Sequence, residues 1–424
     1  MTNTLNQHVG KNALYAQAGG ATAMLNTSAA GVIQAWQQHA PTDAILYAAH
    51  EGILGVLAER LFDVTHLAEH KLQGLAQSPS AAFGTCRHVL QPNEAQRLVD
   101  VLRAHDIGYF FYNGGGGAAR ACQDVLAVAA QFSYPLNAIH IPKTIDNDLP
   151  ATDCSIGFGS AAKYLATSLR EASLDLVSVA SSSSKVFILE TMGRYSGWLT
   201  LACGLAFQHD TKQAYLLLLP ELPFDEQRFL DQVEQIIETY GYCVVAVAEG
   251  VVDSQGKTLH ASGLQDAAGD RQLGGIAPML AELISSKLGH KCHWSVADYL
   301  QRSARHLASL VDSEQALATG QAAVTLALQG QKNFSPIIQR LADSPYQWRI
   351  RPVPLVEVAA PERRVPRDFL SLDGWQLSEA GQTYLLPLIQ GQAPIVFEEG
   401  LPFYPPLNLP FVIKKLAEFE VNPL

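Results

Sequence analysis

The chain has little charge and none of the usual marks of a membrane or disulfide-bonded protein. Charged residues make up 16% of its 424 residues and hydrophobic ones 48%, a globular composition that excludes a large disordered region. Lysine and arginine number 29 against 40 acidic residues, so the formal net charge is −11. This acidic balance argues against nucleic acid or an anionic membrane as a partner, and any phosphate site must be made positive locally.

Cysteines are few, and no apolar run is long. The six cysteines are scattered without a CxxC pair, which predicts reduced thiols rather than a zinc site or a disulfide framework. The N-terminus lacks the apolar core of a signal peptide, and no apolar run reaches the ~20 residues that span a bilayer. We therefore expect a cytoplasmic location.

Short apolar runs alternate with amphipathic stretches along most of the chain. The length of 424 residues exceeds one simple core and favours two domains. Several apolar runs are apolar on both faces, as in a parallel sheet covered by helices, and the alternation predicts an α/β fold. The expected strands are 13–16, 44–48, 108–112, 136–141, 185–190, 214–220 and 242–249, and the expected helices are 23–39, 94–105, 118–130 and 226–240.

Polar or glycine-rich segments follow five of these strands. They begin at Gly19, Asn113, Pro142, Met192 and Glu249. In parallel α/β sheets, ligands bind beyond the carboxyl ends of the strands. We interpret the recurrence of such segments at successive strand ends as one functional site rather than as unrelated turns.

The run from Pro142 to Asp148, Pro-Lys-Thr-Ile-Asp-Asn-Asp, carries most of the candidate chemistry. Two carboxylates and a lysine are costly to hold near a core unless an anion and its metal lie among them. Asp146 can take a proton from an attacking hydroxyl, Asp148 can face a divalent cation, and Lys143 can neutralise phosphate charge. An Asx turn without any chemistry would also explain the Asp-Asn-Asp sequence.

This run resembles the catalytic loop of the phosphofructokinase family, and its lysine form resembles the pyrophosphate-dependent branch. The ATP-dependent branch usually has glycine where Lys143 stands. Further matches follow in family order from about residue 12 to residue 306, and segments at 346–348 and 373–374 fit the long pyrophosphate-dependent type. The resemblance therefore covers nearly the whole chain.

The resemblance implies two Rossmann-like three-layer αβα domains with the active site in the cleft between them, plus a C-terminal extension. Residues 1–150, completed by part of 300–370, would bind the phosphoryl donor, and residues 151–300 would bind fructose 6-phosphate. Residues 330–424 would pack on the body. The sequence there is proline-rich, which predicts an irregular segment wrapped on the surface or across a subunit contact. The resemblance also implies a homodimer or homotetramer.

Glycines dominate the segments that the resemblance assigns to the phosphoryl donor. They let the backbone approach an anion closely, although a Gly-Gly turn serves packing equally well. Arg87 resembles a phosphate-binding arginine, and a surface salt bridge is the alternative. The implied donor-binding set is Gly19, Gly20, Arg87, Gly115, Gly116 and Gly117.

The segment after Asn113 departs from the family. Pyrophosphate-dependent members carry Gly-Gly-Asp-Asp-Ser or Gly-Gly-Asn-Asp-Ser, and the ATP-dependent Gly-Gly-Asp-Gly-Ser binds magnesium through its aspartate. Here the last three positions of this motif are Gly116, Gly117 and Ala118. Glycines still permit close contact with phosphate, but they supply no carboxylate for Mg²⁺. Asp148 is therefore the acidic group expected beside Mg²⁺, the implied cofactor.

Residues of the later strand ends resemble the sugar-phosphate site. Met192 offers an apolar wall, Arg194 a charge-assisted contact, and Glu249 either an acceptor for sugar hydroxyls or a helix cap. Tyr299 and Arg302 resemble the residues that hold the 6-phosphate. The implied substrate-binding set is Thr144, Asp146, Met192, Gly193, Arg194, Glu249, Tyr299 and Arg302.

The resemblance implies reversible phosphoryl transfer from pyrophosphate to the 1-hydroxyl of fructose 6-phosphate, a step of glycolysis and gluconeogenesis. Asp146 would be the base, and Lys143 would hold pyrophosphate. Lys143 favours pyrophosphate as the donor, whereas Gly117 removes that branch's barrier to ATP. One alternative is a low-activity or regulatory paralogue, because of residues 116–118. A dinucleotide-binding oxidoreductase is disfavoured, since the glycine run lacks GxGxxG spacing.

Overall fold

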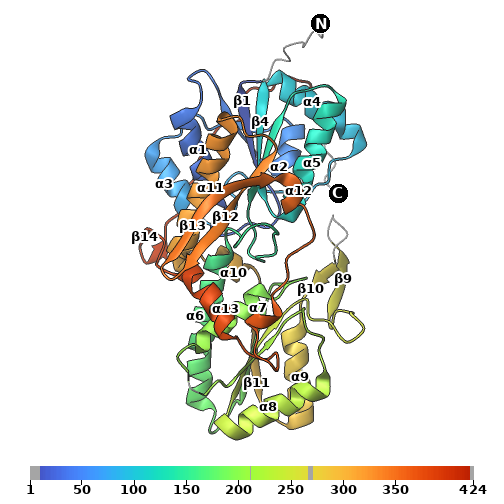
Figure 1. Ribbon diagram of the computed structural model, residues 1–424, viewed down its shortest axis with the longest axis vertical. Helices are drawn as coiled ribbons and strands as arrows, with labels where there is room; N and C mark the ends of the chain where they lie inside the picture. The colour runs from blue at the N-terminus through green and yellow to red at the C-terminus, as the bar shows by residue number, and fades with distance from the viewer. Residues whose placement is uncertain (1–9, 211, 266–270, 421–424) are drawn as a thin grey trace.

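The computed structural model describes residues 10–210, 212–265 and 271–420. Two sheets, each flanked by helices, stack along the long axis of the molecule (Figure 1). The chain builds the first sheet, then the second, and finally returns along the side of both. The predicted α/β fold with two Rossmann-like parts is confirmed.

The first sheet has the order β3-β2-β1-β4-β5, and its strands are parallel except for β3, which runs antiparallel to β2. β1 is buried along its whole length, as expected of a strand with helices on both faces. The strands are β1 (Asn12–Gln17), β2 (Leu46–Ala49), β3 (Leu61–Asp63), β4 (Ile107–Gly114) and β5 (Asn137–Pro142), and the helices are α1 (Leu25–His39), α2 (Gly52–Leu57), α3 (Glu69–Gln77), α4 (Ala95–Ala104) and α5 (Gly116–Gln131).

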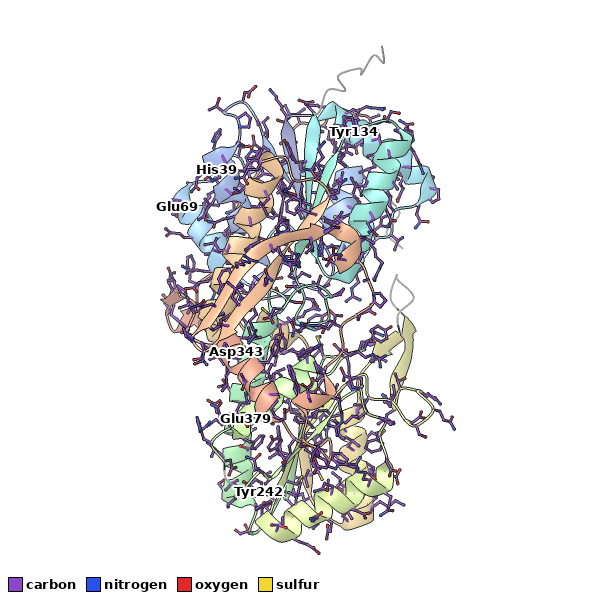
Figure 2. All side chains as sticks on the ribbon, viewed as in Figure 1. His39, Glu69, Tyr134, Tyr242, Asp343 and Glu379 are labelled. Atoms are coloured by element: carbon purple, nitrogen blue, oxygen red, sulfur yellow. The ribbon has the colours of Figure 1, made fainter. Side chains whose placement is uncertain are left out.

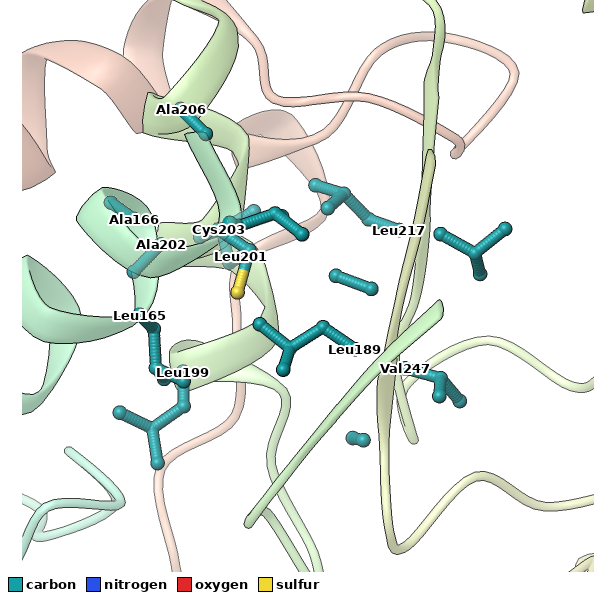
Figure 3. Packing of buried hydrophobic residues seen from close by; sticks show 14 of the residues in the cluster. Leu165, Ala166, Leu189, Leu199, Leu201, Ala202, Cys203, Ala206, Leu217 and Val247 are labelled. Carbon is teal, nitrogen blue, oxygen red and sulfur yellow. The ribbon is translucent and has the colours of Figure 1, made fainter. Parts of the chain in front are cut away.

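The second sheet is parallel, with the order β11-β6-β8-β7. Side chains such as Leu189 and Leu217 lie on the face of this sheet toward Leu165 and Leu201, and Val247 lies on the opposite face (Figure 3). The strands are β6 (Val186–Thr191), β7 (Tyr215–Leu218), β8 (Cys243–Ala248) and β11 (Cys292–Val296), beside the small pair β9 (Ala261–Gln265) and β10 (Arg271–Leu273). The helices are α6 (Phe158–Val179), α7 (Trp198–Cys203), α8 (Glu226–Tyr240), α9 (Ile276–Leu288) and α10 (Asp298–Ser303).

Helix α11 (Leu310–Leu328) returns to the first sheet and packs on α1. Two glycines permit the close approach of these helices. A Cβ at Gly31 would lie 2.3 Å from the Leu317 carbonyl oxygen, and one at Gly320 would lie 2.1 Å from the Ser28 carbonyl oxygen. Any larger residue at either position would push the helices apart.

The C-terminal part is more regular than its prolines indicate. The expectation of an irregular segment is wrong for residues 334–354, because β12 (Phe334–Asp343) and β13 (Tyr346–Pro354) form an antiparallel hairpin beside both sheets (Figure 1). Asp343, near its tip, lies level with the junction of the two parts (Figure 2). The remaining elements are α12 (Leu355–Val358), α13 (Glu379–Leu385), β14 (Phe397–Glu398) and β15 (Leu401–Pro402), with 3₁₀ turns at Pro92–Glu94, Gly204–Phe207, Arg305–Leu307, Arg367–Phe369 and Leu386–Ile389. In the described ranges, no helix is long and apolar enough to cross a bilayer.

Candidate active site

The loop that follows β5 lies between the two parts of the molecule. The Lys143 amide donates to the Gly114 carbonyl (3.0 Å) at the end of β4, and Thr144 pairs with Gly157 just before α6. Asn147 is buried with a positive φ of 53°; its side chain accepts from the Ser155 amide (2.9 Å) and donates to the Tyr384 hydroxyl (3.0 Å). The backbone of this loop is therefore fixed by contacts from distant parts of the chain.

Lys143 is 2% exposed and reaches back to the glycine loop after β1. Its Nζ donates to the carbonyls of Ala18 (3.1 Å) and Gly20. Burial, with repulsion from Arg302 and Arg87, lowers the pKa of Lys143 to about 7, although Asp146 and Asp148 partly oppose the shift. A bound anion would restore the charge of this ammonium group and be stabilised by it.

Asp146 is held in place by a neighbour in its own loop. The Thr144 hydroxyl donates to its carboxylate (3.2 Å), and the Asp146 amide donates to the same hydroxyl (3.1 Å). Burial raises the pKa of Asp146, while the Thr144 hydrogen bond and the charges of Lys143, Arg302 and Arg194 lower it. A raised carboxylate pKa makes a better proton acceptor.

Two further carboxyl groups near Asp146 are also perturbed. Burial and repulsion from Asp146 raise the pKa of Asp148 to about 7 and that of Glu249 to about 7. Three acidic groups that repel one another need cations or hydrogen-bond donors from a ligand to settle their charge.

A cavity of about 180 Å³ is lined by residues of this loop and of both parts of the molecule. It brings together Gly116 and Gly117 of α5 with Asp146 and Asp148, and Arg194 closes it from the second sheet. Other lining residues are Arg120, Leu149, Pro150, Tyr195, Ser196, Val358, Ala360 and Glu362.

Arg302 lies on the other side of the loop, against the first glycine segment. A Cβ at Gly20 would lie 2.9 Å from Arg302 Nη1, so a side chain there would displace the end of this arginine. The Arg302 guanidinium stands 3.9 Å from the centre of the Tyr299 ring, which is exposed. Arg302 and Tyr299 therefore lie beside Lys143 and Gly20 rather than in the wall of the 180 Å³ cavity.

The remaining expected residues surround these two centres. Gly19 has φ 72°, and a Cβ there would be 3.9 Å from Lys143 Nζ; Arg87 is exposed. The Met192 amide donates to the Gln301 side chain (3.2 Å), which ties the segment after β6 to α10. Gly193 has φ 141°, and its missing Cβ would collide with the Ser196 carbonyl at 2.6 Å. Gly115 adjoins the Lys143 carbonyl, 3.6 Å from the Cβ it lacks.

Sequence reasoning missed the contribution of the C-terminal segment. Arg363 donates to the carbonyls of Asn147 (3.0 Å) and Asp153 (2.7 Å), and its own amide donates to the Asp148 carbonyl (2.7 Å). Its guanidinium also stacks over Trp198, 4.7 Å from the ring centre. Glu362, beside it, lines the cavity. A signal for this role was absent, because these residues are some 216 positions from the loop they hold.

The pKa of Asp148 has a consequence for stability. Its folded value of about 7 lies above the ordinary value of 3.8 for an aspartate, so the folded chain binds more protons than the unfolded chain between these pH values. Stability is therefore lost as pH rises through this window. We expect Asp148→Asn to raise the Tm of the ligand-free protein at pH 8 by a few degrees and to leave it nearly unchanged at pH 4. Thermal melts beside the exposed control Asp175→Asn check this, and an equal Tm difference at both pH values would contradict it.

A buried lysine, two buried carboxyl groups and glycine segments close together between the two sheets are the groups that phosphoryl transfer requires. The family model described as phosphofructokinase matches residues 12–327, and the chain belongs to the phosphofructokinase family. This membership replaces the oxidoreductase alternative.

Several relatives match over nearly their whole length. A Halomonas elongata protein named pyrophosphate–fructose 6-phosphate 1-phosphotransferase is 49% identical over 415 residues, covering 97% of this chain and 99% of its own. A Methylococcus capsulatus protein of the same name is 48% identical over 412 residues, covering 96% of this chain and 98% of its own. The solved structure of pyrophosphate-dependent phosphofructokinase from Nitrosospira multiformis has a TM-score of 0.90 at 45% identity, covering 97% of this chain and 100% of that one.

Proposed function

We propose that this chain catalyses reversible phosphoryl transfer from pyrophosphate to the 1-hydroxyl of fructose 6-phosphate, yielding fructose 1,6-bisphosphate and phosphate. The observation that carries the proposal is Lys143, whose buried amine is bound to the glycine loop at Gly20 and whose pKa is influenced by the charge of Asp146. The full-length relatives with that activity in their names support it. The reaction would serve glycolysis or gluconeogenesis.

Asp146 accepts the proton of the attacking 1-hydroxyl. The Thr144 hydroxyl orients its carboxylate, and burial strengthens it as a base. Lys143 neutralises the charge that develops on the departing phosphate, because its amine is held at the start of the phosphate loop. Phosphate oxygens can approach the backbone amides of the glycine segments, because these residues carry no side chains. The residues are Gly19, Gly20, Gly115, Gly116 and Gly117.

The second sheet contributes the sugar-phosphate residues. Arg194 faces the cavity from the segment after β6, and Met192 and Gly193 precede it. Glu249, with its raised pKa, can exchange hydrogen bonds with sugar hydroxyls. Tyr299 and Arg302 supply an aromatic surface and a guanidinium for the 6-phosphate.

Mg²⁺ fits this site as a partner of the bound diphosphate rather than as a resident ion. In the described part of the chain, no group of three or more His, Cys, Asp or Glu residues could hold a metal. Asp148 lines the cavity, and burial together with repulsion from Asp146 disfavours the charged form of its carboxyl group. A bound cation would relieve that repulsion. Mg²⁺ commonly binds one or two carboxylates together with phosphate oxygens and water, and there it offsets charge on the phosphates.

The alternative of a low-activity paralogue arises because residues 116–118 lack the family's polar side chains, and nothing in the structure favours that alternative. Side chains can be restored there, since a Cβ at Gly117 has no heavy atom within 4 Å and one at Gly116 has none within 3.7 Å. We expect the triple variant Gly116→Asn, Gly117→Asp, Ala118→Ser to raise kcat with pyrophosphate about tenfold, through a new oxygen ligand for Mg²⁺. Steady-state kinetics test this, with Gly117→Asn in place of Gly117→Asp as the uncharged control, and an unchanged kcat would refute it.

The activity itself is tested in both directions with Mg²⁺ present. We expect fructose 1,6-bisphosphate to form from pyrophosphate and fructose 6-phosphate, and pyrophosphate to form from fructose 1,6-bisphosphate and phosphate. Sugar-phosphate binding by calorimetry without turnover in either direction would instead establish the paralogue.

The proposed setting is cytoplasmic, and the proposed assembly is a homodimer or homotetramer. All six cysteines are free thiols, which suits a reducing compartment. The edge strand β11 and helix α10 expose Trp294, Tyr299 and Leu300, which supports burial of this face against a second copy. Sedimentation at micromolar concentration measures the assembly.

A further inference from the structure

We propose that Arg120, the cation on the α5 side of the cavity, binds the pyrophosphate and then holds the departing phosphate. This inference rests on the proposed function and adds a residue to its site. Arg120 lies one turn into α5, and its side chain lines the cavity with Asp146 and Asp148.

The guanidinium points toward the start of its helix. Arg120 Nη1 lies 3.7 Å from the place a Cβ would take at Gly116. Because Gly116 and Gly117 carry no side chains, nothing from the first turn of α5 stands between this guanidinium and the cavity. The absence of an acidic residue in that turn also leaves the charge of Arg120 unopposed there.

Arg120 contributes no polar contact to the fold in the described part of the chain. It makes no hydrogen bond or ion pair there, not even with Asp124 one turn further along α5. By contrast, Arg340 is paired with Asp153 (3.0 Å), and Arg363 is bonded to loop carbonyls. An arginine side chain offers five N–H donors in a planar fork that matches phosphate oxygens.

The charges of the cavity wall define which end of the reaction Arg120 serves. Asp146, Asp148 and Glu362 are acidic, and Arg194 is the cation on the side of the second sheet. Arg120 is the cation among the lining residues of the first sheet's helices, where the glycine loops place the diphosphate. A diphosphate held by the glycine loops would have its outer phosphate beside α5, away from the sugar-phosphate side at Arg194, and that outer phosphate is the one that departs.

We expect variants of Arg120 to bind pyrophosphate more weakly while fructose 6-phosphate binding stays nearly unchanged. We expect Arg120→Gln, which keeps length and polarity but removes the charge, to raise the KM for pyrophosphate about tenfold or more. The KM for fructose 6-phosphate should stay within about twofold, and Arg120→Lys should recover part of the loss. Arg170→Gln, an exposed arginine of α6, is the matched control.

Calorimetry of inorganic pyrophosphate with Mg²⁺, without sugar phosphate, separates this inference from the proposed function. Weaker pyrophosphate binding by Arg120→Gln supports the inference even if the wild-type protein fails to turn over. An active wild-type enzyme with unchanged pyrophosphate KM and affinity in Arg120→Gln overturns the inference and leaves the function standing. Equal losses for both substrates, with a lower Tm, would make Arg120 structural and also overturn it.

Discussion

Replacing Asp146 by Asn should lower kcat by about 10³-fold, because the variant keeps the shape of the side chain but cannot accept the proton of the 1-hydroxyl. The Thr144 hydroxyl can still hydrogen-bond to the remaining side-chain oxygen, so the loop should keep its backbone. The KM for fructose 6-phosphate and the Tm should therefore change little. Initial rates at saturating pyrophosphate measure the effect.

The control for this variant is Asp175→Asn, which alters an exposed carboxylate of α6 and should retain full activity. If Asp146→Asn kept more than about a tenth of the wild-type kcat, general-base catalysis by this residue would be rejected. A large drop in the Tm of Asp146→Asn would likewise show that this carboxylate is needed for folding rather than for catalysis.

Lys143→Met should lower kcat/KM with pyrophosphate by about 10²-fold or more, because methionine fills the space of the buried side chain but offers no charge to the departing phosphate. The lysine has little freedom to be replaced, since its Nζ binds the carbonyls of Ala18 and Gly20 and the group is almost fully buried. Burial lowers its pKa to about 7, so the ligand-free protein should be no less stable at pH 8 when the amine is removed.

Lys143→Arg is the informative comparison for that variant. It restores charge but needs more room than a 2%-exposed side chain has, so we expect only partial recovery of kcat/KM. Full activity in Lys143→Met would remove the main argument for pyrophosphate chemistry.

The sheets and the main loops were within reach of sequence reasoning. Strands such as β1 and β8 are buried from end to end, so they appear as continuous apolar runs without alternation. Because parallel strands of one sheet end at one edge, Gly19 after β1 and Pro142 at the end of β5 could be placed near one site from the sequence alone. The roles of the individual side chains remain predictions, which the variants above test.

The hairpin at 334–354 was missed because prolines conceal it. Pro336 and Pro352 are opposite each other in the register, and Pro354 ends β13. Proline normally argues against a strand, yet it is tolerated in a two-stranded ribbon, where one side of each strand has no pairing partner. Only the pairing of the two segments, which no local pattern reveals, makes both of them strands.

Arg363 and Arg120 illustrate two other limits. Arg363 fixes the loop after β5 from far along the chain, and the distance between such partners is not encoded in local sequence. Arg120 is adjacent to the glycine loop, but its orientation toward Gly116 depends on where α5 begins and on the empty space at Gly116 and Gly117. Helix boundaries are the least certain part of a sequence-based prediction.

The most direct test of the account is to compare kcat/KM for pyrophosphate and for ATP, each with fructose 6-phosphate and Mg²⁺ in the same buffer. Lys143 occupies the site with a charge suited to a small departing phosphate, so we expect a preference for pyrophosphate of about 10²-fold or more. A preference for ATP would contradict the account, because the open space at Gly117 would then outweigh Lys143 in selecting the phosphoryl donor.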